Sequence, residues 1–215
     1  RFAIFGGVFV LIAAWEIVRP RRAQGIGRRP RWPGNLAIAS VDAILVRIVF
    51  PLSAVAVAAR GQTTGWGVLP AWGVPDWLAV LLAIVVLDLA IYLQHVLFHA
   101  VPALWRLHRM HHADLEFDLT TGVRFHPIEM LLSMVIKLTV IVALGAPAIA
   151  VFVFEVLLNA TAMFNHSNVQ LPSGIDRVLR WLVVTPDMHR VHHSVVVRET
   201  NSNFGFNLPW WDHVF

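Results

Sequence analysis

Long apolar segments constrain this chain more than any other feature of its sequence. A helix needs about 20 mostly apolar residues to cross about 30 Å of hydrocarbon. Runs of this kind cover residues 2–18, 36–59, 77–99 and 128–164. The last run is too long for one crossing and is interrupted near Gly145 and Pro147, so we expect a helical hairpin that enters and leaves by the same face.

Composition agrees with a membrane protein, because 57% of the residues are hydrophobic and only 14% are charged. We therefore predict an all-α integral membrane bundle of four to five spans, with a helical cap on the cytoplasmic side. Two regions are expected: residues 1–76, with N-terminal spans and an arginine-rich loop, and residues 77–215, with the histidine-rich segments described below. The chain has no cysteine, which excludes disulfides and thiolate metal ligands.

Arginines set the predicted orientation. Lys137 is the only lysine, and six arginines lie between residues 19 and 31, after the first apolar run. Such a loop is typical of the cytoplasmic side of a membrane protein, which accounts for the net charge of +4 without nucleic-acid binding. We expect the bacterial inner membrane, or the endoplasmic reticulum if the source is eukaryotic. Counting crossings from the loop places the histidine-rich segments on the cytoplasmic face.

Eight of the eleven histidines form three short groups. They are His95 and His99; His108, His111 and His112; and His189, His192 and His193. Spacings of three and four residues place side chains on one face of a helix, about one turn apart. So many imidazoles exceed the ligand number of one ion, and two five- or six-coordinate irons fit them better than tetrahedral zinc. Zinc can still replace iron in purified material.

The order of these groups resembles the fatty acid hydroxylase and sterol desaturase superfamily of membrane di-iron enzymes. The resemblance depends on H-x-x-x-H at residues 95–99 and on H-x-x-H-H at residues 108–112 and 189–193. Supporting pieces are RFHPIE at 124–129, NHSN at 165–168, NFG at 203–205 and WD at 211–212. The family usually has tyrosine where Phe204 stands. The resemblance implies that the eight grouped histidines are catalytic metal ligands.

Two further histidines are candidates to complete the metal site by the same resemblance. His126 precedes Pro127 and has an alternative role in bonding local backbone, whereas His166 lies in an asparagine-rich piece that could mark a turn. Carboxylates are expected nearby, because they offset the metal charge and orient the rings. We favour Asp187, Asp212, Asn203 and Asp88 for this supporting role; Glu129, Asp114 and Asp118 are also available.

The predicted function is O2-dependent oxidation of a membrane lipid, with hydroxylation favoured over desaturation. Ligands at the membrane boundary let an apolar substrate arrive from the bilayer while electrons arrive from water. No flavin or nicotinamide fingerprint is present, so a separate electron-transfer protein of the cytochrome or ferredoxin type is expected. A histidine-rich metal transporter or metal-binding protein is the alternative, although its ligands should be spread through the spans. A bis-histidine haem protein and an intramembrane metalloprotease fit less well, the latter because H-E-x-x-H is missing.

Overall fold

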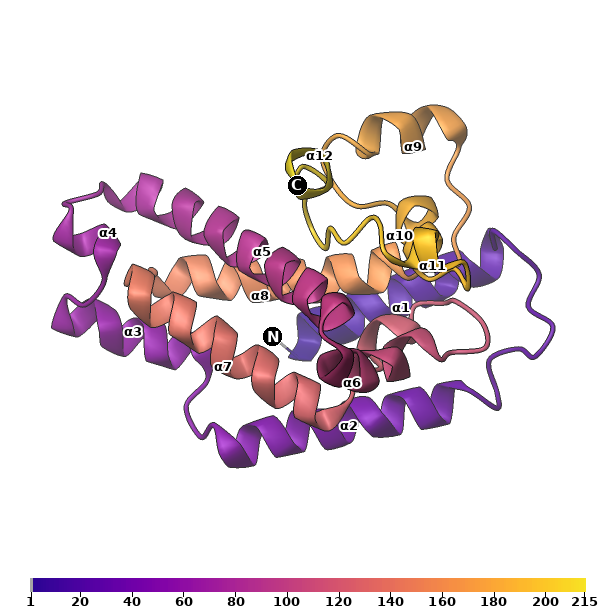
Figure 1. Cartoon of the computed structure of the whole chain (residues 1–215), viewed down its shortest axis with the longest axis horizontal. Coiled ribbons are helices and arrows are strands. Elements are labelled where there is room, and N and C mark those ends of the chain that lie inside the picture. Colours follow the sequence, from indigo (N-terminus) through magenta and orange to yellow (C-terminus); the bar gives the residue numbers. More distant parts are fainter. Residues whose placement is uncertain (1) are drawn as a thin grey trace.

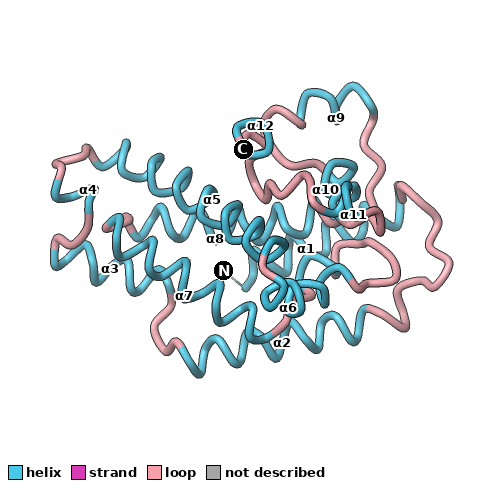
Figure 2. The backbone as a smooth tube through the Cα atoms, in the orientation of Figure 1, coloured by secondary structure: helices cyan, strands magenta, loops and turns pink. Residues whose placement is uncertain are grey.

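The computed structural model describes residues 2–215, and the regular elements assigned in this part of the chain are all helices, joined by loops (Figures 1 and 2). The longer helices are α1 (Phe2–Val18), α2 (Trp32–Val49), α3 (Ala54–Thr64), α5 (Asp76–Ala100), α6 (Pro102–His112), α7 (Pro127–Leu144) and α8 (Ala148–Asn165). Short elements are α4 (Val68–Ala71), η1 (Thr121–Val123), α9 (Ser173–Leu179), α10 (Pro186–His192), α11 (Val197–Thr200) and α12 (Trp211–Val214). The predicted all-α class is confirmed.

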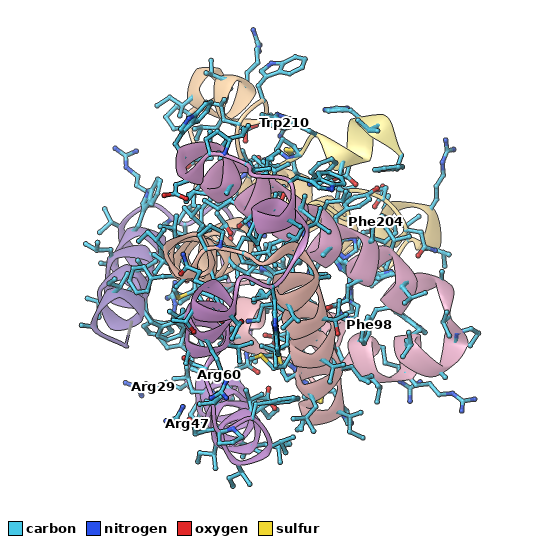
Figure 3. The ribbon with its side chains drawn as sticks, turned by 90° about the vertical axis from the view of Figure 1, so that its left-hand side faces the viewer. Arg29, Arg47, Arg60, Phe98, Phe204 and Trp210 are labelled. Atoms are coloured by element: carbon cyan, nitrogen blue, oxygen red, sulfur yellow. The ribbon has the colours of Figure 1, made fainter. Side chains whose placement is uncertain are left out.

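Four segments of the described chain are long and apolar enough to span a membrane. They are Trp32–Ala71, Asp76–Ala100, Pro127–Leu144 and Ala148–Asn165, with Ala3–Val18 as a shorter apolar helix. The first of them is broken between α2 and α3, next to Pro51. Pro51 has no N–H, and the Ser53 hydroxyl accepts from the amide of Ala56 at 3.2 Å to begin α3. Arg47 and Arg60 point away from the bundle on either side of this break (Figure 3).

The predicted hairpin is present as α7 and α8. It turns at Gly145, whose φ is +66°, and a Cβ at this position would lie 2.0 Å from the carbonyl oxygen of Trp66. Only glycine fits a left-handed turn with so close a backbone neighbour. Small residues such as Ala83 and Ala150, both fully buried, let α5 and α8 approach closely in the core of the bundle.

The N-terminal helices pack against the rest of the bundle rather than standing apart. Ile12 of α1 and Met163 of α8 share a buried cluster, and α2 lies along α7. Glu16 bonds to two loops, because its Oε1 accepts from the amide of Leu119, before η1, at 2.8 Å and from the amide of Asn168, after α8, at 2.6 Å. The first region of the chain therefore contributes directly to the end of the bundle where the histidines lie.

The arginine-rich loop lies at the same end as the histidine segments (Figure 1). Arg31 is buried there and makes ion pairs with Asp114, at 2.9 Å, and with Asp118. Arg21 pairs with Asp187 at 3.1 Å, directly before the last histidine motif. The opposite end of the bundle is formed by α3, α4 and the hairpin turn.

Candidate metal centre

Nine histidines gather in two adjacent groups at this end. The five-histidine group consists of His95, His99, His108, His112 and His192, and the four-histidine group consists of His111, His166, His189 and His193. Within each group the ligand nitrogens lie within 4.8 Å of one another. All eight histidines of the three sequence motifs, and His166, are thus brought together.

Helix geometry distributes each H-x-x-H-H motif over both groups. His108 and His112 of α6 are four residues apart and join the five-histidine group, whereas His111 joins the other. In the second motif, His189 and His193, which are also four residues apart, belong to the four-histidine group, and His192 belongs to the five-histidine group. Residues four apart lie on nearly the same side of a helix, and the residue in between points to a neighbouring direction. Two helices can therefore supply two adjacent centres.

Oxygen acceptors fix the orientation of six rings through their Nδ1 atoms. The contacts are His95 to the carbonyl of Phe204 (2.8 Å), His99 to Oδ1 of Asn201 (3.2 Å), His108 to Oε1 of Glu129 (2.6 Å), His111 to the carbonyl of Arg124 (3.2 Å), His166 to the carbonyl of Ala162 (2.7 Å) and His192 to the carbonyl of Ser202 (2.9 Å). Carbonyl and carboxylate oxygens only accept, so Nδ1 of a neutral ring carries the proton. The lone pair of Nε2 is then free to bind a metal.

The Nε2 atoms of the five-histidine group are buried and have no hydrogen-bond partner among the described residues. In the four-histidine group, Nε2 of His166 lies 3.0 Å from Nε2 of both His111 and His189, and 3.2 Å from that of His193. His111 and His166 both carry their protons on Nδ1, so two lone pairs face each other across one of these contacts. A cation removes the repulsion: two nitrogens bound at about 2.1 Å and at right angles to each other are about 3.0 Å apart. The donor set fits a pair of metal ions.

Burial keeps these rings in the neutral form that binds metals. Desolvation, followed by the charges of neighbouring histidines, lowers the pKa of His111, His189 and His193 well below the ordinary value. Desolvation also lowers the pKa of His166 to about 3. At neutral pH, protons therefore do not compete for the ligand nitrogens.

His126 takes the local role that was considered for it. Its Nδ1 accepts from the amide of Ile128 at 3.1 Å and so caps the start of α7, and it belongs to neither histidine group. Pro127 explains this placement, because a proline at the first position of α7 leaves the next amide free for the preceding side chain. His166, by contrast, lies in the middle of the four-histidine group.

Among the four residues favoured for ring support, Asp187 and Asp88 bind other groups. Asp187 pairs with Arg21 and, at 3.7 Å, with Arg190. Asp88 accepts from Nδ2 of Asn207 at 2.7 Å and from Nε1 of Trp211 at 2.9 Å. Both carboxylates hold the chain around the site rather than a ring.

Asp212 and Asn203 bond to residues whose carbonyls contact a histidine ring, rather than to a ring themselves. Asp212 accepts from the amides of Phe204 and Gly205, at 2.7 and 2.8 Å, and so fixes the carbonyl that receives the His95 proton. Asn203 adopts a φ of 53° and donates to the hydroxyl of Ser202 at 3.3 Å. The carboxylate that touches a ring is Glu129, which was available in the sequence but not favoured. The sequence feature that could have identified Glu129 is its position in the RFHPIE segment at 124–129.

Aromatic side chains cover the five-histidine group on the side of α5. The ring of Phe204 lies 5.1 Å from His99, 5.4 Å from His192 and 6.4 Å from Tyr92, measured between centroids. The ring of Phe98 packs against that of His108, with centroids 6.0 Å apart. Aromatic rings therefore cover this side of the five-histidine group.

The class of protein that this fold and site define agrees with the comparison with known families. Residues 80–215 match the fatty acid hydroxylase family model, and the chain belongs to this family. The predicted superfamily resemblance is thus confirmed. The matched part contains all nine clustered histidines.

Individual relatives are similar over the same part of the chain. Ornithine lipid hydroxylase OlsE of Rhizobium tropici is 34% identical over 136 residues, which cover 63% of this chain and 40% of that protein. Alkylglycerol monooxygenase of Xenopus tropicalis is 29% identical, covering 60% and 28%. The human alkylglycerol monooxygenase is 27% identical, covering 67% and 31%. The chain therefore spans less than half the length of these relatives. No solved structure matches it.

Proposed function

We propose that this chain is the catalytic part of a membrane-bound di-iron oxygenase that hydroxylates a C–H bond of a lipid, using O2 and two electrons. The observation that carries the proposal is the pair of histidine groups, in which nine imidazole rings converge and the Nε2 atoms of the five-histidine group have no hydrogen-bond partner among the described residues. Two irons bound there would supply the oxidant that side chains lack. A transporter is disfavoured because the ligands are confined to one end of the bundle.

The residues of the chain have three tasks in this proposal. Nδ1 contacts to Glu129 and to backbone carbonyls hold the rings in one tautomer, so the ligands need little rearrangement on metal binding. The aromatic cover at Phe204 and Tyr92 receives the apolar part of the substrate and keeps water from the five-histidine group. The partly exposed residues His112 and His193 are the ligands nearest to the aqueous side.

The substrate is inferred to be a membrane lipid, in keeping with the names of the ornithine lipid hydroxylase and the alkylglycerol monooxygenases that the chain resembles. Electrons are inferred to come from a separate cytochrome or ferredoxin type of protein on the aqueous side. Because the arginine-rich loop lies at the same end of the molecule as the histidine groups, we assign that end to the cytoplasmic face of the membrane.

Metal analysis with paired variants tests the proposal. Anaerobically prepared protein should contain about two irons per chain, since each histidine group offers a ligand set for one ion. His192→Ala and His189→Ala should each lower the iron content towards one and abolish lipid hydroxylation, measured by mass spectrometry of lipids from expressing cells. Asp76→Ala, an exposed change at the far end of α5, should alter neither. Wild-type iron content in both histidine variants would refute the ligand assignment.

A further inference from the structure

Large apolar side chains are exposed on one flank of the molecule, outside the spanning segments. We name this flank the lateral surface, and its members have exposed fractions between 44% and 73%. They are Ile175, Val178, Trp181, Leu182, Trp210, Val214 and Phe215. An apolar patch of this kind on a folded protein marks an interaction surface.

Hydrogen bonding joins the members from α9 and α12 into one surface. Nε1 of Trp210, just before α12, donates to the carbonyl of Trp181, just after α9, at 2.7 Å. Trp210 lies at the edge of the molecule beside α9 in the view along the long axis (Figure 3). The two short helices therefore present their apolar side chains as a unit.

The α9 segment is amphipathic. Ile175, Val178 and Leu182 follow the spacing of one helical face, continued through the turn after α9. Arg177 and Arg180 lie on the opposite side and are exposed, and Arg180 pairs with Asp176 at 2.6 Å. An apolar face backed by arginines is typical of helices that lie in the plane of a membrane surface.

Contacts with α5 place the lateral surface beside a membrane span. The ring of Phe215 stacks on Tyr92 at 6.0 Å, and Nε1 of Trp211 donates to Asp88 at 2.9 Å. Tyr92 and Asp88 are eight and twelve residues before the end of α5 at Ala100, or about 12 and 18 Å along the helix. Figure 1 shows α9 and α12 together on one side of the bundle, above α5 and α8 in this view. The C-terminal helix thus lies beside the half of α5 that ends at the histidine groups.

We propose that the lateral surface lies in the headgroup and acyl boundary of the leaflet nearest the histidine groups. Trp181 and Trp210 supply the amphipathic rings that favour this boundary, and the arginines of α9 face the phosphates. The arrangement anchors the C-terminal segment in the plane of the bilayer. It thereby fixes the depth of the carbonyls of Ser202 and Phe204, which hold two ligand rings.

Spin labelling tests this seating directly, because the chain has no cysteine. Val178→Cys and Val214→Cys would be labelled with a nitroxide in vesicles of phosphatidylcholine and phosphatidylglycerol. Val195→Cys, at a position 99% exposed, is the control for water, and Leu81→Cys, at a position of α5 that is 53% exposed, is the control for lipid. Collision with O2 and with a water-soluble nickel chelate is then measured by power saturation.

The ratio of O2 to nickel collisions at Val178 and Val214 should exceed the ratio at Val195 by about threefold or more, and approach that at Leu81. A ratio equal to that at Val195 would overturn the proposal. Low collision rates with both reagents would also overturn it, since they would mean that another protein surface covers the patch. The measurement does not depend on catalysis, so it stands or falls separately from the proposed reaction.

Discussion

Removing the carboxylate of Glu129 should weaken metal binding at the five-histidine group alone. Oε1 of Glu129 lies 2.6 Å from Nδ1 of His108, and both side chains are about 4% exposed. Partners of this kind orient the ring and raise its basicity, and losing one typically costs about 10- to 100-fold in metal affinity, or about 1.4–2.8 kcal/mol. Glu129→Ala should therefore lower the affinity for one of two ions by that factor.

The assay is competition with a chelator of known affinity, followed by counting the metal that remains per chain. Glu129→Gln keeps an oxygen that can accept from His108, so it should lose less affinity than the alanine variant. The four-histidine group should keep its ion in both variants. Equal affinity in wild type and Glu129→Ala, or loss of both ions together with a folded chain, would refute the reasoning that this carboxylate serves His108.

Three other perturbations give distinct outcomes. Burial lowers the pKa of His166 to about 3, so the unfolded chain takes up protons first as the pH falls below about 6.5. The stability that is present above about pH 6.5 should therefore be lost as the pH falls towards 3. We expect the midpoint temperature of thermal unfolding of the metal-free protein to be lower at about pH 5 than at about pH 7.5, and an equal midpoint would contradict this. Arg31→Ala leaves Asp114 and Asp118 without their buried partner and should destabilise the protein by about 3–5 kcal/mol in thermal unfolding, whereas a loss below about 1 kcal/mol would argue against the ion pairs. His126→Ala removes a helix cap, which should cost about 1 kcal/mol while metal analysis still finds both ions.

The spans could be predicted because each depends on local composition. Apolar runs of membrane length, the proline at position 51 and the glycine at position 145 all act on their own helices, and the breaks occur there. The link from Glu16 to the amides of Leu119 and Asn168 could not be predicted. It joins positions more than 100 residues apart, and a single carboxylate bonded to backbone has no periodic pattern.

The histidine clusters were predictable for a similar reason. Residues at positions i and i+4 lie on the same face of a helix, so histidines with this spacing can be recognised in the sequence as candidate ligands of one site. How the ligands divide into five and four was not predicted, because it depends on the relative rotation of α6 and α10. Four of the six oxygens that receive the Nδ1 protons are backbone carbonyls, such as those of Arg124 and Ser202, and a carbonyl is carried by every residue type.

Because α6 and α10 each contribute rings to both histidine groups, a movement of either helix would displace ligands of both groups at once. A substitution that shifts the backbone of α6 or α10 should therefore weaken metal binding at both groups, unlike the loss of a single ring or of one ring-orienting contact such as that of Glu129. The relative placement of the two histidine groups is thus held by helices rather than by a loop.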